Sequence, residues 1–321
     1  YAHINITGMT DGEDRTGKYY DWEDALFRTA VYQTYDLSVS GGTDKSTYYS
    51  SFAYTSDKGR STFNDFSRIS GRVNVTSKIG KHVELATSVN IAHTDQTGYN
   101  DTRNVSSNMF MQTRNLLWPF YWPTDYKTGE PWTDRFGSLA WNLLYYDNEW
   151  NNSSKTFRVN ASETLTIHIL DGLDLRSLFS YDNAETKDHI YYSANHFNAT
   201  DTDGSVTDMS TQYRNWVSST TLSYNKTFAD KHVLSALVGF EAEERDTEFI
   251  RASGTFLPTS TLETVATAGV LDANAYSWGS SMASILSRVE YSYDSRYYVS
   301  GSFRRDGSSK LSPDARWGNF W

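Results

Sequence analysis

The chain has 321 residues, a net charge of −10 and no cysteine. The acidic balance repels a phosphate backbone, so nucleic acid is not an expected partner. The missing cysteines remove disulfides, thiolate catalysis and Cys-based metal sites. Mean hydropathy is −0.60 and no apolar run reaches the length of a membrane-spanning helix. A membrane β-barrel remains compatible, because only alternate residues of each strand face lipid.

Ten candidate strands follow one another, and their connectors alternate between short and long. The short connectors are 41–46, 77–82, 170–172, 229–231 and 294–296, and the long ones are 55–65, 94–153, 183–211 and 247–280. In a membrane barrel, tight turns gather at the periplasmic rim and long loops at the outer rim. The alternation therefore predicts an all-β fold, an antiparallel transmembrane β-barrel segment with short periplasmic turns and long extracellular loops.

Polar and apolar residues alternate with period two along these strands, the pattern of a sheet whose two faces meet different solvents. Segment 68–76 places Ile69, Val73 and Val75 on one row, and segments 83–91, 173–182 and 285–293 repeat the pattern. The apolar row suits lipid and the polar row suits an aqueous lumen. We expect the arginines of the polar row to line that lumen: Arg68, Arg72, Arg158, Arg176 and Arg288.

A soluble antiparallel sheet with one wet face would show the same period. Two features favour the barrel, namely apolar rows that are nearly free of charge and aromatic residues beside the tight turns. The aromatic residues are Tyr48, Tyr49, Tyr224, Phe228, Tyr291, Tyr293, Tyr297 and Tyr298. Glu163 breaks the apolar row of its strand, and either a place near the outer rim or a β-bulge would accommodate it.

The long connector 94–153 is rich in tryptophan and is interrupted by prolines and glycines. So many aromatic residues argue against disorder. Trp118, Trp122 and Trp132 are candidate contacts for a substrate or for a lid over the pore. The alternative, that these rings only pack the loop against the barrel wall, is the commoner arrangement for large aromatic residues.

Motifs for catalysis or cofactor binding are weak. No histidine pair has the H-E-x-x-H spacing of a zinc protease. The acidic stretch around Asp201 and Asp203 lacks the carboxylates that a calcium loop needs at its first and last positions. We expect no cofactor, no metal and no catalytic residue.

Several stretches resemble one family, the SusC/RagA-type TonB-dependent outer-membrane transporters. Segments 223–228, 230–232, 239–241 and 287–293 resemble barrel hairpins, and Asp21-Trp22 with 36–43 resembles the early barrel region. The run Arg304-Arg-Asp306-Gly307-Ser308-Ser-Lys310 looks like the family's R-x-D-G-S-S-[RK] stretch and is the most specific match. Within it, Asp306-Gly307 also reads as a turn signal before a loop.

The resemblance implies import of an oligosaccharide or a peptide across the bacterial outer membrane, driven through TonB. It also implies a SusD-like surface lipoprotein that closes over the barrel as a lid. The chain itself would carry out no covalent chemistry, and it would bind and gate the substrate while embedded in outer-membrane lipid.

The resemblance further implies a partial barrel domain over residues 1–321. We divide it into an early barrel or loop region at 1–32, strands at 33–93, the long aromatic extracellular loop at 94–153 and further hairpins at 154–321. Plugged transporters have 22 strands. We therefore expect a plug domain and a second half of the barrel in a larger polypeptide.

Two alternatives remain. One is a complete ten-stranded outer-membrane hydrolase, which needs a last strand that pairs with the first. Residues 313–321 do not alternate and contain proline and glycine, which argues against closure. The other is a soluble surface protein of β structure that binds glycans.

Overall fold

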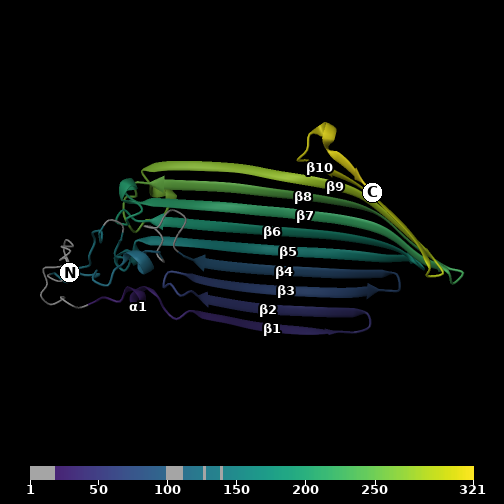
Figure 1. Ribbon diagram of the computed structural model, residues 1–321, viewed down its shortest axis with the longest axis horizontal. Helices are drawn as coiled ribbons and strands as arrows, with labels where there is room; N and C mark the ends of the chain where they lie inside the picture. The colour runs from purple at the N-terminus through teal and green to yellow at the C-terminus, as the bar shows by residue number, and fades with distance from the viewer. Residues whose placement is uncertain (1–18, 99–110, 126–127, 138–139) are drawn as a thin grey trace.

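The computed structural model describes residues 19–98, 111–125, 128–137 and 140–321 (Figure 1). Eleven strands form one antiparallel sheet in which every strand pairs with its neighbours in sequence. The strands are β1 (Val31–Gly42), β2 (Ser46–Lys58), β3 (Asp65–Ile79), β4 (Val83–Thr97), β5 (Trp150–Leu170), β6 (Leu173–Tyr192), β7 (Ser205–Phe228), β8 (His232–Thr255), β9 (Val270–Tyr293), β10 (Tyr297–Ser308) and β11 (Trp317–Phe320).

Several short helical pieces lie outside the sheet among the described residues. They are α1 (Trp22–Leu26), η2 (Gln112–Leu116), η3 (Tyr145–Asn148), η4 (Thr200–Thr202), η5 (Val265–Thr267) and η6 (Pro313–Ala315). Asp21 begins α1 by accepting a hydrogen bond from the Asp24 amide at 3.0 Å, as an N-cap residue does. No helix among the described residues is long and apolar enough to cross a membrane.

The strand register places apolar residues of neighbouring strands in continuous rows. Ile79 lies opposite Val83, and Val83 lies opposite Ile167. The row continues through Leu175, Leu222 and Val238. Side chains that lie directly opposite each other share a face of the sheet. The all-β antiparallel fold and its alternating faces are therefore confirmed.

The side chains on the apolar face of the sheet are exposed. Ile79 is 59% exposed, and Val238 and Phe240 are 50% and 51% exposed. In the part of the chain that the structure describes, the buried hydrophobic clusters lie in the loops and strand ends at one end of the sheet. An exposed apolar surface that crosses so many strands requires an apolar solvent, which supports the lipid-facing interpretation.

Strands β5 to β9 are much longer than expected, with 20 to 24 residues each. The predicted long connectors 183–211 and 247–280 are therefore wrong over most of their length, and the observed connectors are 193–204 and 256–269. A bilayer needs only about 9–11 residues of a tilted strand. Beyond that length both faces meet water, so the alternation that identifies a strand disappears.

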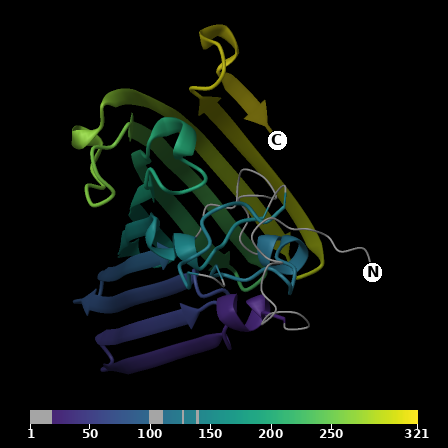
Figure 2. The same cartoon turned by 90° about the vertical axis from the view of Figure 1, so that its left-hand side faces the viewer.

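The sheet is open and curved. Figure 2 looks along the strands and shows the sheet bent, with the loop segments on its concave side. Trp150, Ile190 and Tyr192, which take part in the hydrophobic packing between the loops and the strand ends, lie on the same face of β5 and β6 as the polar row. The polar face is therefore the concave one.

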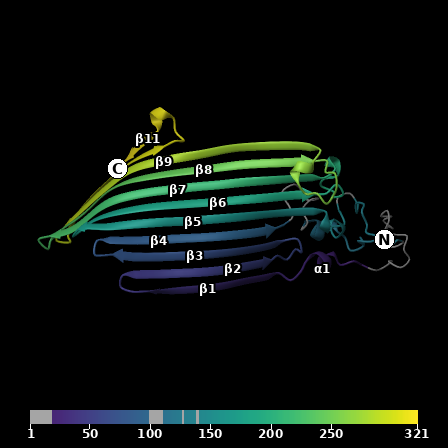
Figure 3. The same ribbon diagram turned by 180° about the vertical axis from the view of Figure 1, so that it is seen from behind.

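The two edges of the sheet are β1 and β11, which lie apart (Figure 3). No pairing joins them, as a closed ten-stranded hydrolase barrel would require. The interpretation of residues 313–321 needs a correction, because Trp317–Phe320 forms an eleventh strand on β10. Proline at 313 starts the short helix η6 before this strand.

Candidate functional site

The polar concave face carries all five arginines that the sequence assigns to the lumen. Arg72 lies opposite Asn90, and the same row continues to Asn160 and Asp182. Arg68, Arg158, Arg176 and Arg288 also occupy this face, as the strand register shows. Because the structure contains no ligand, contact between these arginines and a substrate stays a prediction.

The five arginines differ in their partners. Arg158 Nε donates to Asp182 Oδ1 at 2.9 Å, and Nη2 donates to Oδ2 of the same carboxylate. Arg288 is paired with Glu290. Over the described residues, Arg68, Arg72 and Arg176 form no ion pair. These three cations are therefore available to an anionic group in the lumen.

Arg304 of the family-like stretch lies at the centre of a second polar network on the concave face. Its Nε donates to Asp306 Oδ1 at 2.6 Å, and its Nη2 lies 3.1 Å from Glu241 Oε2 and from Ser284 Oγ. The network joins β8, β9 and β10 across their polar row. The sequence places Glu241 in the hairpin segment 239–241 on a lumen row, but it contains no sign of the contact with Arg304.

The turn predicted at Asp306-Gly307 is wrong, because both residues lie inside β10. Gly307 pairs with Ala283 on one side and with Trp317 on the other. A Cβ on Gly307 would lie 2.8 Å from the Trp317 ring. The glycine is required for this close approach of the ring. Ser308 ends the strand, and its amide donates to the Arg316 carbonyl at 3.0 Å.

Glu163 lies within a regular part of β5, with Thr87 and Phe179 as its cross-strand neighbours. The register irregularity of this strand is at His168 to Leu170, so no bulge accommodates Glu163. Thr87 Oγ1 donates to its carboxylate at 2.7 Å. The exposed apolar face thus contains one carboxyl group held by a neighbouring hydroxyl.

A hydrophobic cluster lies at the outer end of the sheet, and we call it the loop cluster. Its buried members are Trp22, Leu26, Phe63, Leu117, Tyr121, Phe136, Ala140, Leu143, Tyr192 and Ala199. Trp22 Nε1 donates to the Tyr121 carbonyl at 3.0 Å, across 99 residues of sequence. The Tyr121 and Phe136 rings stack at 4.9 Å. The cluster fixes the segment before β1 to the long connector.

The structure separates the three candidate tryptophans. Trp118 is 53% exposed and contacts Phe120 edge-on at 5.4 Å. Trp122 is partly buried, with its ring 5.7 Å from Tyr20. Trp132 stacks on Phe136 at 6.2 Å and packs against the loop cluster. Packing accounts for Trp132, whereas Trp118 presents a free ring face to solvent, and substrate or lid contact stays a prediction for all three.

His196 connects a second loop to the loop cluster. It is fully buried, and its ring lies 4.3 Å from Phe197, 4.7 Å from Tyr192 and 5.4 Å from Tyr146. Burial lowers the pKa of His196 to about 3. The imidazole is therefore neutral at physiological pH. No motif surrounds His196, so its contacts with the loop cluster could not be predicted from the sequence.

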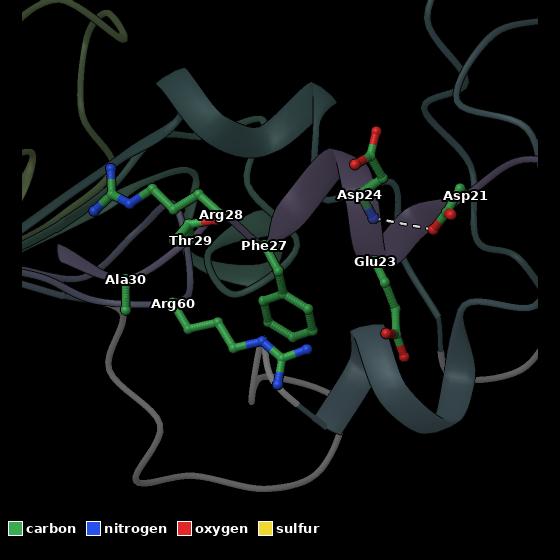
Figure 4. A pocket seen from close by; sticks show the side chains of 8 residues that line it. All are labelled: Asp21, Glu23, Asp24, Phe27, Arg28, Thr29, Ala30 and Arg60. Atoms are coloured by element: carbon green, nitrogen blue, oxygen red, sulfur yellow. Dashed lines mark hydrogen bonds between the residues drawn. The ribbon is translucent and has the colours of Figure 1, made fainter.

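A cavity of about 560 Å³ lies beside α1 at the outer end of β1 (Figure 4). Arg28 and Arg60 line it together with Asp21, Glu23 and Asp24. The Arg60 guanidinium lies 5.0 Å from the centre of the Phe27 ring. The cavity has charges of both signs, with Arg28 in the segment before β1 and Arg60 in the loop that joins β2 to β3.

Arg28 has a structural role at this cavity. Its Nε donates to the Gly59 carbonyl at 3.0 Å and its Nη2 to the Asn64 carbonyl at 3.1 Å. It also forms an ion pair with Asp65. Arg28 thereby holds the connector between β2 and β3 against the segment that precedes β1, and its donors are occupied by protein groups.

Known proteins resemble the chain along nearly all of its length, although no family model matches it. TonB-dependent receptor P39 of Formosa agariphila is 24% identical over 98% of the chain and 30% of the relative. TonB-dependent receptor SusC of Bacteroides thetaiotaomicron is 25% identical over 94% of the chain and 31% of the relative. The structure of the RagAB peptide transporter superposes with a TM-score of 0.79 at 23% identity, over 94% of this chain and 34% of that one.

The chain spans about 30% of the length of the curated relatives that it matches. Its sheet matches the fold of TonB-dependent receptor barrels, and its location is the bacterial outer membrane. The chain is therefore a relative of the SusC- and RagA-type TonB-dependent receptors, matching a segment of their β-barrel.

Proposed function

We propose that the protein containing this chain imports a nutrient, an oligosaccharide or a peptide, across the bacterial outer membrane in a TonB-dependent manner. The observation that carries the proposal is the two-faced sheet. Its convex face is apolar and exposed, and its concave face carries arginines and carboxylates. A wall of this kind separates lipid from an aqueous passage. The similarity to SusC and to the RagAB peptide transporter supports the same function.

The chain contributes part of the barrel, as a partial barrel domain over residues 1–321. The plug and the second half of the barrel belong to other parts of the protein. TonB would act through the plug segment. A SusD-like surface lipoprotein would cover the outer mouth, where the exposed ring of Trp118 is a suitable contact.

The mechanism is binding and gating, and the chain is not an enzyme. A substrate enters at the outer mouth, beside the loop cluster. When the plug is displaced, the substrate passes along the concave face. The unpaired Arg68, Arg72 and Arg176 attract anionic or hydrogen-bonding groups on the way, and the paired Arg158 and Arg304 hold the wall together.

A deletion strain tests the proposal. Growth is measured on single oligosaccharides and on defined peptides as sole nutrients, with the intact gene restored as the control. We expect loss of growth on one class of nutrient and recovery on complementation. Growth on every nutrient at the parental rate, with the protein found in the cytoplasmic fraction, contradicts the function.

A further inference from the structure

The convex face of strands β8 to β10 contains a hollow of about 270 Å³. Ala242, Ala283 and Gly307 form its floor, and they lie opposite one another in a single row of the apolar face. Trp216 and Trp317 line the hollow at its two ends. Short side chains between two large rings account for the depression. The hollow opens toward the outside of the barrel.

The floor of the hollow consists of strands that are paired on both sides at this level. β8 lies between β7 and β9, β9 between β8 and β10, and β10 between β9 and β11. A plug would meet the concave face, and further strands would follow β11. The hollow therefore stays on the outer surface of a complete barrel.

The length of β10 places the hollow at the outer surface of the bilayer. This strand has 12 residues, Tyr297–Ser308, and a tilted strand needs about 9–11 residues to cross the hydrocarbon. It starts at the short turn 294–296, so its last residues reach the headgroups. The chain turns back there, whereas β9 extends outward as far as Val270 (Figure 1). Tryptophan at both ends of the hollow fits the membrane interface, where indole rings are enriched.

Two arginines flank the Trp317 ring. Arg305 lies on the convex face, opposite Ile285 on one side and Asn319 on the other. Its guanidinium lies 5.3 Å from the centre of the Trp317 ring. Arg316 lines the hollow directly before Trp317, and both arginines are exposed. An arginine at the end of an apolar row extends toward the headgroups.

The carboxylates near the hollow have other partners. Glu244, on β8, accepts a hydrogen bond from the indole N–H of β7 at 3.0 Å. Glu243 forms an ion pair with an arginine of its own strand. Among the residues that the structure places, Arg305 and Arg316 form no ion pair. The loop between β10 and β11 adds one cation and one carboxylate, Lys310 and Asp314. The end of the hollow beside β11 is therefore positively charged, and an anionic group complements it.

We propose that this hollow binds a phosphorylated glycolipid of the outer leaflet. The phosphate groups of the lipid pair with Arg305 and Arg316, and its apolar surface covers the floor beside Trp317. Phosphate is the anionic group that headgroups present at this height, and guanidinium groups bind it through two parallel hydrogen bonds. The inference goes beyond the proposed import function, because the site lies on the outside of the wall and contacts no cargo.

Two lipids that differ only in phosphate test the inference without any mutation. The full-length protein in detergent micelles is titrated with bisphosphorylated lipid A, and the complexes are counted by native mass spectrometry. The control is the same lipid A after removal of both phosphates. We expect about ten-fold weaker binding of the control. Equal binding of the two lipids overturns the inference. Displacement of lipid A by excess inorganic phosphate also overturns it, because it indicates a site for a soluble anion.

Neighbouring arginines on opposite faces of β10 give a matched pair of variants. Arg305→Gln removes the cation beside Trp317, whereas Arg304→Gln removes a cation of the concave face. We expect Arg305→Gln to weaken binding of phosphorylated lipid A about ten-fold and Arg304→Gln to leave it within about two-fold. Binding of dephosphorylated lipid A should be the same in both variants. An equal loss of phosphorylated lipid A in the two variants contradicts the site.

A photo-reactive residue gives an independent measurement if Arg305→Gln fails to fold. In place of Ser281 it lines the hollow, and in place of Ser280 it lies on the concave face. Irradiation of intact cells should attach lipopolysaccharide to the protein through position 281 and not through position 280. Absence of an adduct at 281, or equal adducts at both positions, contradicts the site.

Discussion

The lipid-facing half of the sheet and the loop cluster use the same kinds of residue in opposite ways. On the sheet, Val73, Val238 and Phe240 are exposed in continuous rows. In the loop cluster, Phe136 and Leu143 are 2% and 0% exposed. The strands leave their apolar surface to a surrounding solvent, whereas the loops bury theirs against each other. Hydrophobic residues therefore report two different environments within one chain.

Different interactions stabilise the two regions. The sheet is held by backbone pairing between neighbouring strands and by the bilayer. The loop cluster is held by ring packing and by side-chain bonds to the backbone, as Trp22 makes to Tyr121. A substitution that alters the contact with lipid should therefore destabilise the sheet. A substitution that alters ring packing should destabilise the loop cluster.

The largest loss of stability is expected when a ring of the loop cluster is truncated. Phe136→Ala removes a ring that stacks on both Tyr121 and Trp132. Truncation of a buried phenylalanine costs about 3–5 kcal/mol. We expect rapid cleavage within residues 111–148 during limited proteolysis, with the barrel still resistant to detergent. Trp118→Ala, which removes an exposed ring, is the control and should leave cleavage unchanged. Equal protection of Phe136→Ala would show that the cluster is not a folded core.

The second test addresses the lipid face. Val73→Arg places a charge on the apolar row between Ser50 and Val89, which costs about 2–4 kcal/mol near the bilayer midplane. We expect less folded protein in heat-modifiability gels and a lower midpoint of denaturant unfolding in lipid vesicles. Ser162→Arg, at the same level on the polar face, should change the midpoint little. Similar losses in both variants would contradict the assignment of the two faces.

Acid should act on the loop cluster and leave the sheet intact. Burial lowers the pKa of His196 from 6.5 to about 3, so between these values the unfolded loop binds a proton that the folded loop does not. The stabilisation is complete above pH 6.5 and is lost as the pH falls toward 3. We expect a loss of about 2 kcal/mol at pH 5, measured by hydrogen exchange of residues 193–204. His196→Phe keeps a ring and should abolish the pH dependence.

The smallest effect is expected at the polar network of the sheet. Arg304→Ala leaves Asp306 and Glu241 without their shared cation. Because the three side chains are partly exposed, solvent screening limits the loss to about 1 kcal/mol. A modest fall in the unfolding midpoint is expected, and the double variant with Glu241→Gln should restore part of it. A loss as large as that of Val73→Arg would mean that the concave face is not hydrated.

Much of the sheet follows from the sequence, because period-two alternation depends on two solvents. The paired tight turns, the rows of Val73 and Val89 and the face of the arginines were all visible there. The outer halves of β6 and β8 could not be recognised in the sequence. Asn183, Glu185 and Lys187 continue the row of Phe179. Outside the bilayer this row meets water, so a strand there has the composition of a loop.

The loop cluster was only partly predictable. Its aromatic richness suggested order, but the contacts of Trp22 with Tyr121 and of His196 with Tyr146 join residues that lie far apart in sequence and have no spacing that reveals them. The prediction of a turn at Asp306-Gly307 was wrong for another reason. The dipeptide favours a turn locally, but pairing on both sides and the ring of Trp317 keep it in a strand. Tertiary contacts outweighed the local preference.

The length of the strands beyond the bilayer determines which charges are felt at the outer end of the sheet. Strands β7 to β9 have 24 residues each, so more than ten residues, about 30 Å of strand at roughly 3.3 Å per residue, continue beyond the hydrocarbon. Salt screens charge over about 8 Å at physiological ionic strength. Headgroup phosphates therefore exert almost no field on the top of the wall. A molecule arriving there senses only the fixed charges of the protein, and changes in lipid composition should leave its capture rate unaltered.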